Sequence, residues 1–175
     1  MINSESPAEY HTTSTNMVDI PIDRCPTMSD RDRKTVARAI KLLATHLQEH
    51  GEAMLSPEVV KDYLTLHLAA LRDETFTVMY LDNRHRVITT VDHFHGTIDA
   101  ATVYPRVILT HALRVNAAAV IFAHNHPSGI TEPSKADRVI TDKLKEVLAL
   151  AEVRVLDHII VAGLNTLSFA EKGLI

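Results

Sequence analysis

Residues 117–129 read AAAVIFAHNHPSG, and the rest of the chain is interpreted outward from this stretch. Its first part, residues 117–123, is short and wholly apolar, as is typical of a strand covered on both faces. Its second part contains Pro and Gly in a polar setting, which predicts that the strand ends in a turn. His124 and His126 stand at that end. The loops after strand ends commonly form crevices in sheets flanked by helices, so functional groups are expected here.

Helical and strand-like patterns alternate around this stretch. Period-two alternation predicts a hairpin, with strands at 75–81 and 86–94 joined by a turn at 82–85. Apolar residues at helical spacing predict the helices. The first predicted helix is capped by Ser29 and ends at Gly51, and the second starts at Ser56-Pro57. Two more helices are predicted over 101–114 and 134–151. Further strands are predicted at 153–162 and 167–169. The fold class is therefore α/β or α+β, with a mixed β-sheet flanked by helices.

Composition divides the 175 residues into three parts. Residues 1–28 are polar, rich in Ser, Thr and Pro, and without periodicity, so they are expected to form a flexible tail. Residues 29–52 are expected to form a helical appendage, and residues 53–175 the domain that holds the candidate site. A chain of this length can bury a core without disulfides or structural metals.

Charge and cysteine content narrow the class of protein. The net charge of −4 gives no overall attraction to nucleic acid, although Arg31, Arg33, Lys34 and Arg38 could form a local basic patch. The single cysteine, Cys25, fits a reducing compartment. No segment has 18 consecutive apolar residues, and the N-terminus lacks the basic and apolar regions of a signal peptide. We expect a soluble cytoplasmic protein without membrane contact.

The two histidines form a candidate metal site. On a strand, residues i and i+2 point to the same side with Cα atoms ~6.5–7 Å apart, so both imidazoles can reach one zinc ion. Asp137 is the best third ligand, because a carboxylate on the inward face of a helix is costly unless it is paired or binds metal. Two His and one Asp would leave the fourth zinc position open to water. Asp137 is in phase with the apolar residues Ile140, Leu144, Val147 and Leu148.

The residues alone also permit a structural interpretation. Ser134-x-x-Asp137 is the pattern of a capping box, in which the two side chains satisfy backbone N–H groups at a helix start. Nucleases named for the letters His-Asn-His carry those residues widely spaced, whereas here they are adjacent, so that interpretation is set aside. A metal site and a helix cap both stay open at this point.

The pattern His124-x-His126-x7-Ser134-x2-Asp137 resembles the core motif of the JAMM (MPN/JAB) metalloproteases. The fuller pattern HNHPSG-x3-PS-x2-D is similar to the RadC-type branch, and the resemblance runs from about Ser56 to the C-terminus. It implies a cytidine-deaminase-like JAB/MPN architecture. Long RadC proteins begin with a helix-hairpin-helix region, and this sequence has no such region. It therefore looks more like the short RadC-like proteins of prophages and mobile elements.

The resemblance also implies roles for individual residues. One zinc ion per chain would be held by His124, His126 and Asp137, with a water molecule as the nucleophile. Glu74 matches the glutamate that takes a proton from that water and passes it to the leaving amine; on sequence alone it could be an exposed charge at a strand edge. Ser134 would donate a hydrogen bond to the oxyanion. Asn125 departs from the Ser or Thr that the deubiquitinases usually carry, so the substrate does not transfer with the motif.

Three functions follow as hypotheses. The first is a zinc-dependent metallopeptidase or isopeptidase acting on a protein or peptide. The second is a DNA-repair or mobile-element accessory of the RadC type, acting on or near nucleic acid, which the net charge does not support. The third is a catalytically silent interaction module, against which the complete ligand set argues. Asp157-His158 is interpreted as a ligand-orienting group or a buried structural pair, and Arg106 as a carboxylate-binding or an exposed residue.

Overall fold

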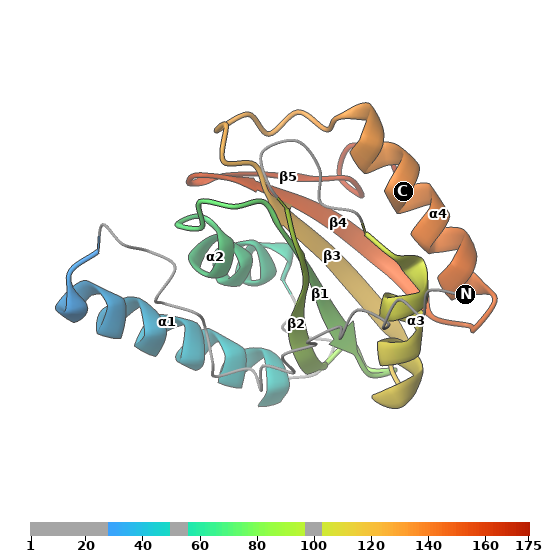
Figure 1. Ribbon diagram of the computed structural model, residues 1–175. Coiled ribbons are helices and arrows are strands. Elements are labelled where there is room, and N and C mark those ends of the chain that lie inside the picture. The colour runs from blue at the N-terminus through green and yellow to red at the C-terminus, as the bar shows by residue number, and fades with distance from the viewer. Residues whose placement is uncertain (1–27, 50–55, 97–102) are drawn as a thin grey trace, which may run out of the picture.

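A mixed sheet forms the centre of the protein (Figure 1). The structure, a computed structural model, describes residues 28–49, 56–96 and 103–175. Within these ranges the strand order is β2-β1-β3-β4-β5; β3 and β4 are parallel, and the other neighbours are antiparallel. The elements are α1 (Asp30–Glu49), α2 (Pro57–Leu68), β1 (Thr75–Leu81), β2 (Val87–His95), α3 (Pro105–Arg114), β3 (Ala119–Asn125), α4 (Lys135–Ala149), β4 (Arg154–Ala162) and β5 (Asn165–Ser168). The predicted mixed sheet flanked by helices is confirmed.

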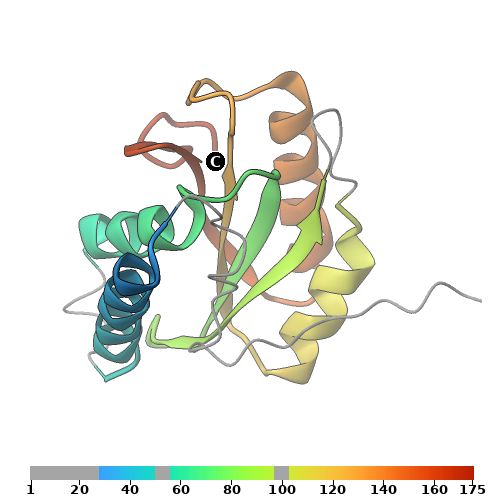
Figure 2. The same ribbon diagram turned by 60° about the vertical axis from the view of Figure 1, so that its left-hand side comes forward.

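The sheet is covered on both faces. Figure 2 shows α1 and α2 on one side of it and α3 and α4 on the other. Side chains of β3 alternate between the two hydrophobic clusters: Ile121 and Ala123 pack toward α1 and α2, while Val120 and Phe122 pack toward α3 and α4. Every residue of β3 is buried, which explains why its sequence is apolar without alternation. This position at the centre of the sheet gives the two histidines a rigid support.

The predicted helix starts at Ser29 and Ser56 are confirmed. The Ser29 hydroxyl accepts the N–H of Asp32 at 3.2 Å, and the Ser56 hydroxyl accepts the N–H of Val59 at 3.4 Å. Pro57 occupies the first helical turn, where its missing N–H removes no helical bond. The predicted helix end at Gly51 and most of the predicted tail lie outside the described residues, as does the predicted boundary at residue 53.

Several predicted boundaries are wrong: the helix predicted over 134–151 spans Lys135–Ala149, and the strand predicted over 167–169 spans Asn165–Ser168. The helix predicted from residue 101 begins at Pro105, because the residue before a proline is driven out of the helical region, and Tyr104 is extended with φ −99° and ψ 109°. The strand predicted over 117–123 spans Ala119–Asn125 instead. Ala117 belongs to the turn that ends α3, since its N–H donates to the carbonyl of Ala112 at 2.9 Å. Asn116 makes that turn possible with a left-handed φ of 54°.

Helix α1 contributes to the core through the second half of its length. Ile40, Ala44 and Leu47 are buried and belong to the same cluster as α2 and one face of the sheet. The first half of α1 is mostly exposed. In the part of the chain that the structure describes, no helix is both long enough and apolar enough to cross a bilayer.

A buried ion pair, which no pattern in the sequence predicted, joins α2 to β2. His67 Nε2 lies 2.8 Å from Asp92 Oδ1, and the Thr77 hydroxyl donates to the same oxygen at 2.8 Å. Burial disfavours both charges, yet the attraction and hydrogen bond between them prevail: the pKa of Asp92 is lowered to about 2, and the pKa of His67 is raised above 6.5. Each group is therefore charged over a wider pH range in the folded chain.

We expect the contribution of this pair to stability to depend on pH. The depressed pKa of Asp92 gives stability that is complete above about pH 4 and is lost as the pH falls toward 2. The raised pKa of His67 gives stability that is complete below about 6.5 and is lost as the pH rises through its folded pKa. The difference in melting temperature between wild type and Asp92→Asn should therefore be largest between these limits. A difference that does not vary with pH would contradict this assignment.

Candidate metal centre

Three side chains converge between the end of β3 and the start of α4. His124 lies in β3, His126 follows it, and Asp137 lies in the first turn of α4. His124 Nε2 and His126 Nε2 are 2.9 Å apart, and they lie 3.4 and 3.5 Å from the two carboxylate oxygens of Asp137. Among the described residues, these three form the group of His, Cys, Asp or Glu side chains that could hold a metal ion, with ligand atoms within 4.8 Å of one another.

The spacing of these atoms fits zinc. Tetrahedral bonds of about 2.0–2.1 Å place neighbouring ligand atoms about 3.3–3.4 Å apart. The 3.4 Å from His124 Nε2 to Asp137 Oδ1 equals that value, and the 2.9 Å between the two Nε2 atoms is somewhat shorter. The donor set of two imidazoles and one carboxylate is one that zinc accepts in catalytic sites. The predicted ligand trio is thus brought together in a geometry that fits the ion.

His126 presents the correct nitrogen to this site. Its Nδ1 lies 2.7 Å from the carbonyl oxygen of Ile130, which can only accept a hydrogen bond. Nδ1 must therefore carry the proton, and Nε2 is left with the lone pair that a metal needs. The Asp137 carboxylate beside the ring raises the pKa of His126, burial opposes this, and the hydrogen bond to Ile130 and the charge of Glu74 add to the increase.

His124 is oriented by a buried chain of hydrogen bonds that returns to Asp137. Thr141 donates its only hydroxyl proton to the carbonyl of Asp137 at 2.5 Å, so His158 Nδ1–H must donate to the Thr141 oxygen at 2.6 Å. Burial and the neighbouring His124 lower the pKa of His158 well below its usual range, which keeps it neutral. Its Nε2 then accepts from His124 Nδ1 at 2.8 Å. The chain leaves His124 Nε2 free to bind metal.

The position of His158 shows which of the two interpretations of Asp157-His158, a ligand-orienting group or a buried structural pair, applies to each residue. His158 contacts the candidate ligand His124 through its ring, whereas the Asp157 carboxylate accepts hydrogen bonds from the Ser168 hydroxyl at 2.6 Å and from the N–H groups of His158 at 2.7 Å and Ala170 at 2.9 Å. Asp157 therefore holds the backbone of His158, while the His158 ring contacts His124. Thr141 was missed, although it lies four residues after Asp137 on the same face of α4, which was the available signal.

We expect Thr141→Val to weaken zinc binding while Thr141→Ser does not. Valine has the shape of threonine but removes the acceptor that fixes the His158 tautomer, whereas serine keeps the hydroxyl. Outer partners of this kind typically contribute about 10–100-fold to metal affinity. Competition with a chromophoric chelator measures the zinc dissociation constant of both variants. Equal affinities for the two would show that the chain does not orient His124.

Asp137 is both inward-facing and part of a helix cap. Its Oδ2 accepts the N–H of Ser134 at 2.7 Å, and the Ser134 hydroxyl accepts the N–H of Asp137 at 3.1 Å. These are the two bonds of a capping box. Burial alone would raise the pKa of Asp137, but the two imidazoles of His124 and His126 beside the carboxylate outweigh burial and lower it. The two interpretations left open by the sequence are therefore compatible.

Glu74 comes directly before β1, close to the end of β3. Phe76, two residues later, pairs with His124 across β1 and β3, and the backbone ladder between the two strands ends at that pair. The side chain of Glu74 is half-buried, and its carbonyl accepts the N–H of Gly96 at 2.8 Å. Glu74 is therefore at the edge of the centre, with its charge close enough to affect His126.

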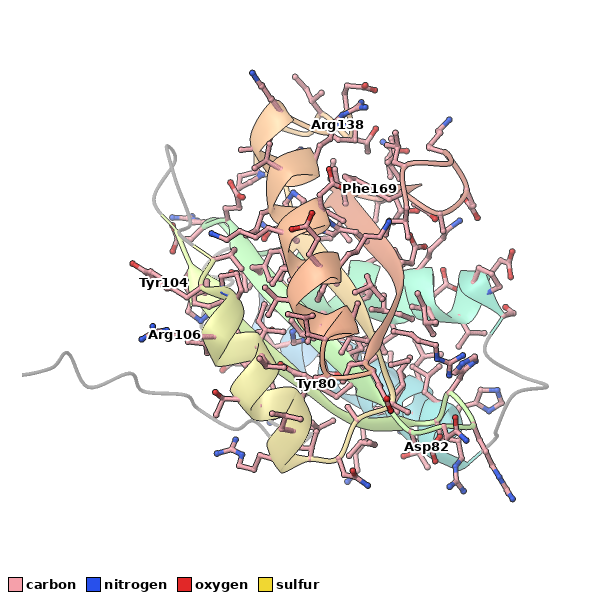
Figure 3. The ribbon with its side chains drawn as sticks, turned by 90° about the vertical axis from the view of Figure 1, so that its right-hand side faces the viewer. Tyr80, Asp82, Tyr104, Arg106, Arg138 and Phe169 are labelled. Atoms are coloured by element: carbon pink, nitrogen blue, oxygen red, sulfur yellow. The ribbon has the colours of Figure 1, made fainter. Side chains whose placement is uncertain are left out.

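A cavity lies beside the candidate metal centre, and Arg106 lies away from it (Figure 3). A cavity of about 420 Å³ lies beside His126, bordered by the residues after α2, by Pro127 and Gly129, and by the end of β4. Arg72 lines it. Arg106 is exposed on α3 and points away from the rest of the molecule (Figure 3), so the alternative of an exposed residue is the one the structure favours.

Comparisons with known proteins agree with this geometry. A family model described as the RadC-like JAB domain matches residues 54–174. The chain is 49% identical over 148 residues to the UPF0758 protein YkfG of Escherichia coli K12, a match covering 85% of this chain and 94% of YkfG. It is 53% identical over 133 residues to a UPF0758 protein of Nitrosococcus oceani, covering 74% of this chain and 59% of that protein.

A third relative, the UPF0758 protein PSHAa2643 of Pseudoalteromonas translucida, is 58% identical over 120 residues, which is 69% of this chain and 54% of that protein. The chain thus spans nearly all of YkfG but less than two thirds of the two longer relatives. The family match takes in the whole segment from α2 to β5, including every residue of the candidate centre. With its mixed sheet and its His-His-Asp trio, this chain belongs to the RadC-like JAB domain family.

Proposed function

We propose that this protein is a zinc-dependent hydrolase that cleaves a peptide or isopeptide bond. The observation that carries the proposal is the convergence of His124 Nε2, His126 Nε2 and the Asp137 carboxylate, with both histidine Nδ1 atoms already committed to acceptors. A purely structural group of polar residues would not need both rings in the metal-binding tautomer. Membership of the RadC-like JAB domain family supports the same proposal.

In the proposed reaction, zinc would activate the water molecule, and side chains of the protein would transfer the proton and contact the substrate. Bound zinc would act as a Lewis acid that makes a water molecule nucleophilic near neutral pH. Glu74 accepts a proton from the attacking water and returns it to the nitrogen of the bond being cleaved, which leaves as an amine. The Ser134 hydroxyl accepts a hydrogen bond within the cap, so its own hydrogen is available to the carbonyl oxygen of the substrate. The products are a carboxylate and an amine.

Metal removal tests the proposal. We expect the protein to bind one zinc per chain and to hydrolyse at least one member of a panel of fluorogenic peptides and isopeptide-linked conjugates. Dialysis against a chelator should abolish that activity, and stoichiometric zinc should restore it. Mass spectrometry of the metal content and a cleavage assay give the two readouts. A wild type that holds no zinc after reconstitution contradicts the metal site, and a zinc-loaded protein inert on the whole panel contradicts the hydrolase.

A basic helix face supports a second candidate, an accessory that acts on or near nucleic acid. Arg31, Lys34 and Arg38 are exposed, share one face of α1 by their spacing, and border a common hollow. Phosphate contacts release counterions, so binding to a DNA duplex should weaken steeply with salt and should weaken further in Arg31→Glu/Arg38→Glu. Absence of binding at low salt, measured by fluorescence anisotropy, would dispose of direct DNA contact.

A further inference from the structure

The residue between the two histidines holds the segment that carries Glu74. Asn125 is buried, with 2% of its surface exposed. Its Oδ1 accepts the N–H of Thr75 at 2.8 Å, and its Nδ2 donates to the carbonyls of Asp73 at 3.2 Å and Leu71 at 3.3 Å. Both chain neighbours of Glu74 are therefore bound by one side-chain amide.

This amide continues the sheet where the backbone ladder stops. The paired residues of β1 and β3 end with Phe76 and His124, and beyond that point the Asn125 side chain supplies the link between the two segments. The His126 N–H is directed instead to the carbonyl of Val161 in β4, at 2.8 Å. Side chains alternate along β3, so the amide lies on the opposite face from the His124 ring and does not compete for its ligand position.

Few side chains can make these three bonds at once. The position requires one acceptor and two donors within reach of three backbone groups, and an amide provides them. A serine or threonine hydroxyl has a single proton and a shorter reach, and an ionised aspartate has no donor. Losing the amide would leave the N–H of Thr75 and two carbonyls without this partner in a buried setting, which is unfavourable.

We propose that Asn125 is a positioning residue, which fixes the backbone of residues 73–75 so that the Glu74 carboxylate is held beside the metal centre. The inference rests on the proposed function, because it assumes that Glu74 acts there as the base. Small displacements of a reacting group reduce rates by up to about a hundredfold, so fixing this backbone matters for catalysis. The zinc ligands themselves are held by other bonds, from Ile130, His158 and β4.

The test compares Asn125→Ser and Asn125→Asp with the control Thr77→Val in the full chain. The control removes one buried hydrogen bond from the same strand, to Asp92, and so matches a general loss of stability. In crystals of the zinc-loaded Asn125 variants we expect the Glu74 carboxylate to shift relative to zinc while the ligand distances stay the same. Amide exchange of residues 71–75 should rise at least about tenfold in Asn125→Ser, but not in the control.

Kinetics then separate positioning from folding. We expect kcat to fall at least about tenfold in both Asn125 variants, zinc affinity to change less than about twofold, and the double variant with Glu74→Gln to be no slower than Glu74→Gln alone. An unmoved Glu74, or zinc affinity that falls in step with kcat, overturns the proposal. Should wild type show no hydrolysis, the proposed function fails, while the crystal and exchange measurements still decide whether Asn125 positions Glu74.

Discussion

Glu74→Gln is expected to reduce hydrolysis by about a thousandfold or more and to leave zinc bound. A general base contributes typically about 10²–10⁴-fold to a rate, and glutamine keeps the shape of glutamate while removing its ability to take a proton. Zinc should stay, because its proposed ligands are His124, His126 and Asp137 and Glu74 is not among them. Cleavage of any substrate found in the panel, together with metal content, measures both effects.

Asp73→Asn is the matched control for this substitution. It makes the same change of charge one residue away, on an exposed side chain whose backbone carbonyl, rather than its carboxylate, contacts Asn125. We expect this variant to keep its activity within about threefold, since an exposed charge has a small effect at a distance. Full activity in Glu74→Gln, or loss of zinc from it, would show that Glu74 has another role.

The parts of the site that the sequence predicted share one property: their geometry is set by a local period. His124 and His126 are two residues apart at a strand end, and Asp137 shares the helical phase of buried residues such as Leu144. Period two in strands and period 3.6 in helices determine the face on which a side chain lies. Knowing these faces was enough to predict that the two histidines and Asp137 lie close together. The sheet itself followed from the same periods, with errors confined to boundaries.

The contacts that the sequence left open or missed join residues distant in sequence: the role of His158 stayed an alternative, and the bonds of Asn125 and of Thr141 to His158 were missed. His158 reaches His124 because β3 and β4 are parallel in a register that pairs Phe122 with His158, and no local pattern encodes that register. The same holds for Asn125, whose partners lie 50 residues and more before it. The α3 boundary failed for a different reason: the apolar phase before Pro105 continued the helical pattern, while the proline excluded a helix there.

Asp137 shows why a capping pattern and a metal-ligand pattern need not compete. The cap uses one carboxylate oxygen for the Ser134 N–H, at 2.7 Å, while the other oxygen faces His124 at 3.4 Å. A carboxylate has about four lone-pair sites, so one oxygen can accept from the backbone without giving up metal binding. The cap also fixes the carboxylate at the start of α4, so the proposed ligand would be ordered before an ion binds. Substitutions that remove one role at a time can therefore separate the two.

Asp137→Asn is expected to weaken zinc binding by at least about a hundredfold while leaving the helix cap intact. The asparagine carbonyl can still accept the Ser134 N–H, but the amide has no charge to offer zinc, and a direct ligand should matter more than the outer partners that contribute about 10–100-fold. Ser134→Ala should do the reverse: it removes the hydroxyl that accepts the Asp137 N–H and lowers stability by about 1 kcal/mol, with zinc affinity nearly unchanged.

Asp137→Ala removes both the proposed zinc ligand and the acceptor of the Ser134 N–H, so we expect it to lower zinc affinity and stability together. Chelator competition gives the zinc affinity of the three variants, and thermal unfolding of the metal-free proteins gives their stability. If Ser134→Ala lost zinc as strongly as Asp137→Asn, the cap itself would be governing the metal site. If Asp137→Asn bound zinc like wild type, the carboxylate would serve only the helix. Opposite effects of Asp137→Asn and Ser134→Ala are expected because one Asp137 oxygen accepts the backbone N–H of Ser134 and the other is the one proposed to bind zinc.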